Sequence, residues 1–237
     1  MAEHHRRNVP YYERLLPEDQ QELLGGIQVF VAEKNFEGCG GLKLTDEIKV
    51  TIAAYACILL LHRQHDFYPR LKSILVYTDA YTADVTRRGP GNLVVEGIED
   101  RAGESWQTGA VVVAWNHVLR RPGVPQGSHN VILHEFAHQL DQEDGVADGA
   151  PLLPKTSMYA AWAQILGSEY QTLIDEVKAG YPTLLDQYGA TNPAEFFAVV
   201  TEHFFEQPKQ LKERHPALYE ELMTFYQQDP AARLSPE

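Results

Sequence analysis

One segment in the second half of the chain, NVILHEFAHQLDQEDG at residues 130–145, constrains the fold and the function most strongly. It places His134 and His138 four residues apart in an apolar run, with Glu135 directly after the first histidine. On an α-helix a four-residue step turns through about 400°, so both imidazoles lie on one face, about 6 Å apart along the axis. The pattern therefore predicts a helix that offers two nitrogen ligands to one metal ion.

The glutamate of this H-E-x-x-H segment has a different expected role. Glu135 turns about 100° away from His134, so it is poorly placed to bind the same ion but well placed to act as a general base on a water molecule. The histidine and glutamate content of the chain predicts roughly 0.04 chance matches to the pattern. The alternative is a pair of histidines that hydrogen bonds satisfy without a metal.

A catalytic zinc ion usually takes three protein ligands and keeps a water molecule, so a third ligand is expected elsewhere. Residues 142–145 contain two acids and no histidine, which excludes the third histidine of a metzincin. The best downstream source is a predicted amphipathic helix, NPAEFFAVVTEHFF at residues 192–205, which carries Glu195 and Glu202. These two glutamates are seven residues apart and near the same face, so periodicity alone does not choose between them.

The charge balance excludes some functions. The chain has 33 acidic and 20 basic residues, a formal net charge of −13, which argues against direct nucleic-acid binding and against anionic membrane surfaces. The longest apolar run, residues 51–61, is shorter than the roughly 20 residues of a bilayer span, and the N-terminal segment lacks the apolar region of a secretory signal. Two cysteines cannot form a disulfide framework, so we expect a cytoplasmic protein.

The hydrophobic pattern predicts one α+β domain over residues 1–237, mostly helical with a small sheet. Its parts are an N-terminal helical segment at about 11–65, a sheet region at about 70–118 and metal-site helices at about 129–228. We expect a short helix from Pro17, a second helical segment ending toward Gly38 and a central helix from Thr45. The predicted strands are residues 72–79, 91–100 and 108–115, and the later helices are residues 158–180, 192–208 and 216–230.

Two smaller features allow more than one interpretation. The strand near residues 109–115 could be a sheet edge to which a peptide substrate adds as a further strand, or it could be an ordinary core strand. The histidines His62 and His65 have no evident partners in the sequence, so we expect no catalytic role for them.

Four stretches, HEFAHQLD, NPAEFFAVVTEHFF, GESWQTGAVVVAW and FYQQDPAARL, resemble the Mlc titration factor A (MtfA) family of bacterial zinc metallopeptidases. The catalytic domain of that family is similar to that of anthrax lethal factor, and the resemblance covers roughly residues 15–234. It implies a zincin-like metallopeptidase fold, with a small mixed sheet beside the zinc-binding helix. It also implies one Zn²⁺ per chain.

The resemblance assigns roles to individual residues. The first two zinc ligands map onto His134 and His138, and the third, the glutamate of an Asp/Asn-Pro-Ala-Glu segment, maps onto Glu195. The catalytic glutamate maps onto Glu135, and Tyr188 matches a tyrosine that helps to stabilise the oxyanion. Glu202 is then expected to accept the free N–H of a ligand imidazole; Asp141 could do the same or could be a solvated acid at the end of the helix.

We therefore expect a zinc metallopeptidase that acts on a peptide or protein substrate. Whether it is an aminopeptidase or an endopeptidase stays open at this point. The main alternative is a regulatory protein that sequesters a transcriptional repressor of the Mlc type, an activity that the family name implies and that does not require hydrolysis. A purely structural zinc ion is disfavoured, because a His₂Glu set leaves a coordination position open.

Overall fold

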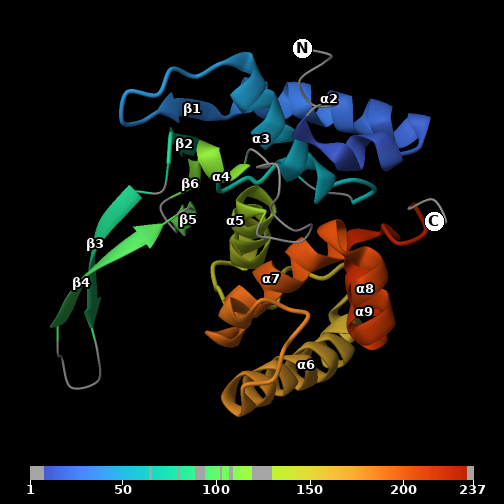
Figure 1. The fold of residues 1–237 in the computed structure, drawn as a ribbon. Coiled ribbons are helices and arrows are strands. Elements are labelled where there is room, and N and C mark those ends of the chain that lie inside the picture. Colours follow the sequence, from blue (N-terminus) through green and yellow to red (C-terminus); the bar gives the residue numbers. More distant parts are fainter. Residues whose placement is uncertain are drawn as a thin grey trace.

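The computed structural model of the 237-residue chain describes residues 8–63, 66–79, 81–88, 94–101, 103–106, 109–118 and 130–233 (Figure 1). His65, one of the two histidines without an evident partner, lies outside these residues. The structure is mostly helical with a small sheet, which confirms the predicted α+β class. Among the helices that the structure describes, none combines the length and apolarity that a bilayer span requires.

The N-terminal part differs from the prediction. Helix α2 (Pro17–Glu33) runs without a break through Gly25 and Gly26, and the next four residues form strand β1 (Asn35–Gly38), so the predicted second helical segment ending toward Gly38 is wrong. The glycine pair does not end the helix, because the rest of α2 buries an apolar face. A Cβ atom on Gly26 would lie only 3.4 Å from the sulfur of Cys57, so glycine allows α2 to pack closely at this position.

The predicted central helix is confirmed. Helix α3 (Asp46–Ile58) begins after Thr45, whose side chain accepts a hydrogen bond from the backbone N–H of Ile48 at 3.3 Å. Its residues from Val50 to Ile58 are all buried, as the nearly continuous apolar sequence of this helix requires. Helix α3 therefore lies between α2 and the rest of the molecule (Figure 1).

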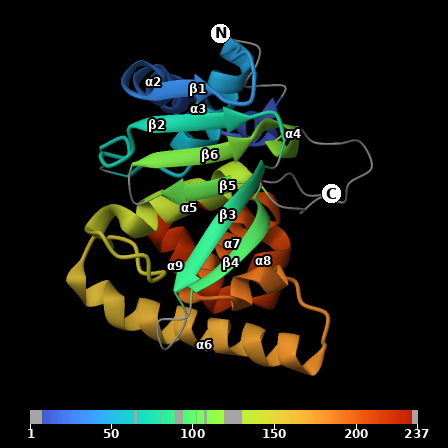
Figure 2. The same ribbon diagram turned by 90° about the vertical axis from the view of Figure 1, so that its left-hand side faces the viewer.

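The main sheet has four strands in the order β1, β2 (Ser73–Tyr77), β6 (Ala110–Ala114) and β5 (Gly103–Trp106). The first three are mutually parallel and β5 is antiparallel to β6. Figure 2 shows this order from top to bottom, with helix α5 (Val131–Asp141) behind β5. Strand β6 lies between two others, so the suggestion that residues 109–115 form a sheet edge is wrong, and the edge on this side is β5.

The predicted strand at residues 91–100 does not join the main sheet. Strand β4 (Val94–Arg101) pairs in antiparallel register with β3 (Tyr81–Arg88), and the two form a separate hairpin that projects beside the helices (Figures 1 and 2). Residues 91–93 lie outside the described residues. The sequence pattern identified the strand but not its partner, because pairing depends on a second segment that the pattern did not mark.

The second half of the described chain is helical, as predicted. Helix α5 contains the H-E-x-x-H segment, and α7 contains the two candidate glutamates. The two helices pack directly against each other. The remaining elements are α4 (Trp115–Val118), α5 (Val131–Asp141), α6 (Tyr159–Ala179), α7 (Pro193–Glu206), α8 (Pro208–Arg214), α9 (Pro216–Tyr226) and the 3₁₀ helices η1 (Pro10–Arg14), η2 (Gln142–Asp144), η3 (Thr156–Met158) and η4 (Gln187–Ala190).

Aromatic side chains fix α5 against the N-terminal helices. Phe136, on α5, is fully buried, and its ring centroid lies 5.0 Å from that of Tyr68 and 5.7 Å from that of Phe30. Edge-to-face contacts at these distances add directional attraction to the burial of apolar area. The apolar side of α5 is therefore held in the core, which leaves its histidine-bearing side to face α7.

His62 has partners in the structure that were not evident in the sequence. The Nε2 atom of His62 lies 2.6 Å from a carboxylate oxygen of Asp19, and its Nδ1 atom lies 2.9 Å from the carbonyl oxygen of Gln227. The other Asp19 oxygen accepts a hydrogen bond from Arg233 at 2.6 Å. His62 therefore joins the N-terminal helices to the C-terminal tail, a contact between chain segments too distant for a sequence pattern to reveal.

Candidate metal centre

Helix α5 presents its polar residues from a buried position. Asn130 caps the helix by accepting a hydrogen bond from the backbone N–H of Leu133 at 3.2 Å. His134, Glu135 and His138 are 7%, 5% and 8% exposed, although all three carry polar groups. Burial of such groups is costly unless partners compensate it, so the surroundings of these three residues must supply those partners.

Helix α7 brings a carboxylate to the same place. Asn192 is its cap and accepts a hydrogen bond from the backbone N–H of Glu195 at 3.0 Å, and Pro193 occupies the first helical position. The side chain of Glu195 turns toward α5, where its carboxylate meets His134 and His138. A carboxylate in the first turn is also favoured by the helix dipole.

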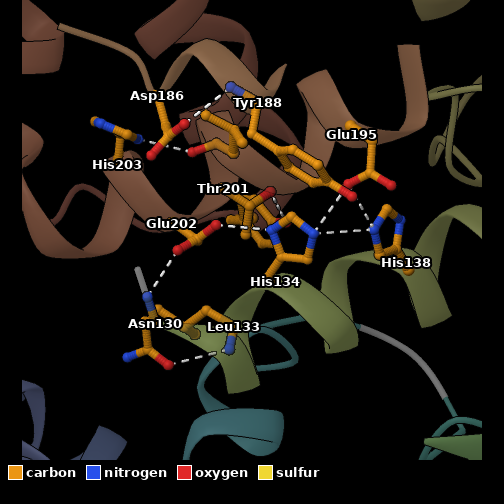
Figure 3. Close-up of polar contacts among 12 residues, drawn as sticks. Asn130, Leu133, His134, His138, Asp186, Tyr188, Glu195, Thr201, Glu202 and His203 are labelled. Carbon is orange, nitrogen blue, oxygen red and sulfur yellow. Dashed lines mark hydrogen bonds and ion pairs between the residues drawn. The ribbon is translucent and has the colours of Figure 1, made fainter. Parts of the chain in front are cut away.

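Three donor atoms converge between the two helices (Figure 3). The Nε2 atoms of His134 and His138 lie 3.2 Å apart, and a carboxylate oxygen of Glu195 lies 3.0 Å and 3.3 Å from them respectively. Ligands placed tetrahedrally at the usual zinc distances of 2.0–2.1 Å would be about 3.3 Å apart. The spacing of the three atoms therefore suits one small tetrahedral cation.

The protonation of these atoms points the same way. The Nδ1 atom of His134 lies 2.7 Å from Glu202 and its Nε2 atom lies 3.0 Å from Glu195, so the protonated ring donates a hydrogen bond to each carboxylate. Burial opposes charge on His134, but the two carboxylates outweigh it and raise its pKa to about 10. Burial also opposes charge on Glu195, but hydrogen bonds from His134 and His138 outweigh it and hold the pKa of Glu195 well below its usual range. The site therefore attracts positive charge.

Glu135 differs from the other acids of the site. Its Oε2 atom is buried and has no hydrogen-bond partner among the described residues. Burial raises the pKa of Glu135 to about 7, although the neighbouring His134 and His138 oppose the rise. A buried carboxylate oxygen without a partner is costly in a folded protein, and such groups often mark the place of a water molecule, an ion or a chemical role.

Tyr188 reaches the site from η4. Its backbone N–H donates to Asp186 at 2.8 Å, and its ring centroid lies 6.1 Å from that of His134. The side chain is 49% exposed, and Figure 3 shows the ring extending toward Glu195 and His134. The structure thus brings Tyr188 beside the converging donor atoms, on a side that solvent reaches.

The two further acids behave differently from each other. Glu202 faces the Nδ1 atom of His134, as the resemblance implied, and so does not join the Nε2 atoms. Asp141 is fully buried and accepts a hydrogen bond from the backbone N–H of Gly149 at 3.0 Å, so the alternative of a solvated acid is wrong.

Asn130 was missed as a site residue, although an asparagine at the start of an apolar helix is a common cap.

A pair of histidines on one helix, a carboxylate from a second helix and a buried glutamate beside them are the parts of a metallopeptidase centre. The chain belongs to the family of glucose-regulated metallo-peptidases M90, whose model matches residues 1–227. Membership of this family implies a metal ion.

Individual relatives extend the comparison over nearly the whole chain. An uncharacterised protein of Synechocystis is 44% identical over 223 residues, which cover 94% of this chain and 81% of the relative. Mlc titration factor A of Klebsiella pneumoniae is 31% identical over 229 residues, which cover 95% of this chain and 85% of the relative. The protein of the same name from Serratia proteamaculans is 31% identical over 229 residues, which cover 95% of this chain and 86% of the relative.

Proposed function

We propose that the protein is a zinc-dependent peptidase in which His134, His138 and Glu195 hold the ion. The observation that carries the proposal is the convergence of their three donor atoms, 3.0–3.3 Å apart, between two packed helices. Nitrogen and carboxylate donors in this number suit Zn²⁺ and leave a coordination position open. When bound, the ion would polarise the scissile carbonyl and acidify a water molecule.

Two residues of the chain would move protons in this reaction. Glu135 accepts the proton of the attacking water and delivers it to the leaving amine, a role that its unpartnered, buried Oε2 atom supports. Tyr188 donates its phenolic hydrogen to the oxygen on which negative charge develops. Its exposed position beside His134 supports this role, because a substrate would approach from the solvent side.

The decisive experiment combines metal analysis with peptide turnover. Glu135→Gln should retain zinc at the wild-type ratio and lose about 10²–10⁴-fold in turnover of a chromogenic peptide, because the general base is removed and the ligands are not. Glu143→Gln, the same change just beyond α5, serves as the control and should retain both. Undiminished turnover in Glu135→Gln would exclude Glu135 as the base.

The same assay separates two kinds of peptidase. Peptides with a free and with an acetylated N-terminus should be compared, since an aminopeptidase requires the free amine and an endopeptidase does not. We propose aminopeptidase-like activity as the form to test first. Equal turnover of both peptides would instead establish an endopeptidase.

A second candidate is a regulatory binding protein that sequesters a repressor of the Mlc type. It is favoured by the name of the relatives from Klebsiella pneumoniae and Serratia proteamaculans, Mlc titration factor A. A pull-down with a purified Mlc-type repressor should compare wild-type, metal-free and Glu135→Gln protein. Equal capture by all three would establish binding as a function separate from hydrolysis, and no capture would remove this candidate.

Two broader proposals accompany the function. We propose a zincin-like fold, supported by the family membership and by a small sheet packed beside the H-E-x-x-H helix. We also propose a cytoplasmic location, which the free state of both Cys39 and Cys57 supports. The structure of a zinc-loaded crystal and fractionation of cells that produce the tagged protein would test the two proposals.

A further inference from the structure

A groove with a volume of about 490 Å³ lies beside the candidate metal centre, and none of the proposed metal ligands lines it. Residues 182–187 form one wall, and the facing wall is the side of α7 that carries Glu202, His203 and Gln207. We call it the 182–187 groove. Its volume falls in the range of sites that bind small ligands, so it has room for a side chain or an end of a peptide.

Both walls of the 182–187 groove continue into the candidate metal centre. Tyr188 follows the first wall directly in the chain, and Figure 3 shows its ring extending from beside Asp186 toward His134. On the second wall, the carboxylate of Glu202 lies 2.7 Å from the Nδ1 atom of His134. A peptide held at the metal centre would therefore reach the groove with a long side chain or with its terminus.

The first wall is held against α7, so the groove does not depend on a ligand for its shape. His203 is 6% exposed, and its two ring nitrogens lie 2.9 Å and 3.0 Å from the carbonyl oxygens of Val199 and Leu184. A Cβ atom on Gly189 would lie only 3.3 Å from Val199, so the turn that follows the wall also packs closely on α7. Both ring nitrogens of His203 thus serve the wall and not a ligand.

The charged groups of the groove are acidic. Among the described residues that line it, none is lysine or arginine, and two are acids. The oxygens of Glu202 are already engaged with His134 and with the backbone N–H of Asn130. Asp186 differs, because it is exposed and uses one oxygen to cap η4, accepting from the backbone N–H of Tyr188 at 2.8 Å. Within the described part of the chain, no cationic side chain pairs with Asp186.

The amide groups of Gln187 and Gln207 lie on opposite walls of the same groove. Carboxylate and amide oxygens accept hydrogen bonds, whereas an ammonium or guanidinium group donates several and accepts none. The net charge of −13 also favours the approach of a cation. We propose that the 182–187 groove is a substrate subsite for a positively charged group of the peptide, and that Asp186 selects for the charge.

This inference rests on the proposed peptidase function and names the chemistry of its substrate. The positive group could come from a lysine or arginine side chain or from the N-terminal ammonium, and both present the same donors to Asp186. The two sources differ in one respect that an experiment can use. Acetylation of the N-terminus removes the terminal charge and leaves a side-chain charge in place.

Peptide binding to Glu135→Gln protein tests the subsite without requiring hydrolysis. The probes are alanine peptides with a C-terminal fluorophore and one central lysine, norleucine or glutamate, each with a free or an acetylated N-terminus. Fluorescence anisotropy gives the dissociation constants. We expect a positively charged group to improve binding about fivefold over its neutral counterpart, the scale of one partly exposed ion pair, and we expect the glutamate peptide to bind most weakly.

Asp186→Asn removes the charge and keeps an oxygen that can cap η4. In the Glu135→Gln background it should lose the preference for the charged group. Asp144→Asn is the matched control, because Asp144 is an exposed acid that also accepts from the backbone N–H two residues further on, at 2.9 Å, but lies outside the groove. It should keep the preference. A displaced Tyr188 would weaken charged and neutral peptides alike, so the ratio of their dissociation constants reports the charge alone.

The outcomes separate the two sources of charge from failure of the proposal. A preference for lysine that Asp186→Asn abolishes assigns the side chain, and a preference for the free N-terminus that it abolishes assigns the ammonium. Equal binding of charged and neutral peptides, no binding of any peptide, or the same preference in Asp186→Asn and Asp144→Asn would overturn the proposal.

A measurement on the Glu135→Gln protein alone covers the case in which Asp186→Asn does not fold. The order of affinity, with the lysine peptide or the free N-terminus first and the glutamate peptide last, should flatten as salt is added. Glutamate binding as well as lysine would overturn the proposal. If zinc-loaded wild-type protein hydrolysed none of the peptides, the proposed peptidase would fail, while the ratios of dissociation constants would still decide the subsite.

Discussion

Two groups of histidine and carboxylate side chains, each with donor atoms within 4.8 Å of one another, lie in the described part of the chain. One is the candidate metal centre of His134, His138 and Glu195. The other, which we call the His62 cluster, consists of Asp19, Glu22 and His62, and it lies between α2 and the C-terminal tail. Both groups combine histidine with acidic side chains, so residue type alone does not show which of them could hold a metal ion.

Their hydrogen bonds separate them. Each ring nitrogen of His62 faces an oxygen, of Asp19 at 2.6 Å and of Gln227 at 2.9 Å, so the ring must donate from both and carry a positive charge. Arg233 brings a second cation to Asp19. Asp19, the buried acid of the His62 cluster, therefore has two cationic partners, whereas at the candidate metal centre one carboxylate oxygen of Glu195 faces the Nε2 atoms of both histidines.

The backbone shows what the His62 cluster does instead. His62 and Gln227 both have positive φ, 65° and 53°, a conformation that costs a non-glycine residue of order 1 kcal/mol. The hydrogen bond between them joins the two segments that carry this strain. We infer a structural role for the His62 cluster, because Arg233 supplies a permanent positive charge to Asp19. We infer a chemical role for the other group, where the side-chain partners of the Glu195 carboxylate among the described residues are the two histidines.

The largest expected effect is loss of the metal from one cluster and not from the other. Glu195→Ala removes a proposed ligand, so the zinc affinity of this variant should fall steeply. The loss should exceed the roughly 100-fold that is typical when a residue hydrogen-bonded to a metal ligand is removed. Asp19→Asn should bind zinc like the wild type. Titration against a competing chelator measures both. Zinc loss in Asp19→Asn alone would reverse the assignment of the two clusters.

The next effect tests whether the metal centre is chemical. Tyr188→Phe should lower the turnover number about 100-fold, the scale on which single oxyanion donors act, and should leave zinc content unchanged. Tyr181, 63% exposed and seven residues earlier, is the matched control. Steady-state kinetics on a chromogenic peptide would separate them. If Tyr181→Phe and Tyr188→Phe behaved alike, the phenol of Tyr188 would have no special role.

A smaller effect is expected on stability at the His62 cluster. Asp19→Asn removes the buried anion that accepts from both His62 and Arg233, so the free energy of unfolding should fall by about 2 kcal/mol. Denaturant titration measures the loss, with Glu18→Gln, an exposed acid on the same helix, as the control. Stability equal to the wild type would mean that the network contributes nothing measurable.

The smallest effect is a pH dependence of stability that arises from the His62 cluster. Burial opposes charge on both residues, but the hydrogen bonds of His62 to Gln227 and Asp19 raise the pKa of His62 above 6.5. The hydrogen bonds of Asp19 with His62 and Arg233 lower the pKa of Asp19 below 3.8. The His62 contribution is complete below about pH 6.5 and is lost as pH rises through the raised value. The Asp19 contribution is complete above about pH 4 and is lost as pH falls through the lowered value.

Stability from this cluster should therefore be greatest between about pH 4 and pH 6.5, and each unit of pKa shift corresponds to about 1.4 kcal/mol at most. Thermal unfolding of the wild type and of His62→Gln should be measured from pH 5 to pH 9, with a chelator present to remove metal ions. The difference between the two proteins then gives the stability that His62 loses as pH rises. Because the pair is partly exposed, we expect a difference of about 1 kcal/mol or less. If the stability of the two proteins changed with pH in the same way, the proposed dependence on His62 protonation would be contradicted.

Local patterns predicted the elements that carry the site. The H-E-x-x-H spacing predicts both histidines on one face of a helix, and α5 has this form, while Thr45 marks the start of α3. The continuous helix α2, the strand β1 and the partner of β4 were not predicted, because each depends on packing or pairing with a distant segment. The single-domain organisation stays a prediction.

The sequence alone determined the candidates: two histidines one turn apart, a glutamate between them and two further glutamates on one later helix. Periodicity left open which of these two glutamates meets the histidines and the resemblance assigned Glu195; the tertiary structure shows Glu195 facing the Nε2 atoms and Glu202 facing Nδ1 of His134. It also decided that His62 pairs with Asp19, which Arg233 contacts as well, so both ring nitrogens of His62 already have partners. The physical reason is that helical periodicity is a property of neighbouring residues, whereas the direction of a lone pair depends on side chains more than 40 positions away.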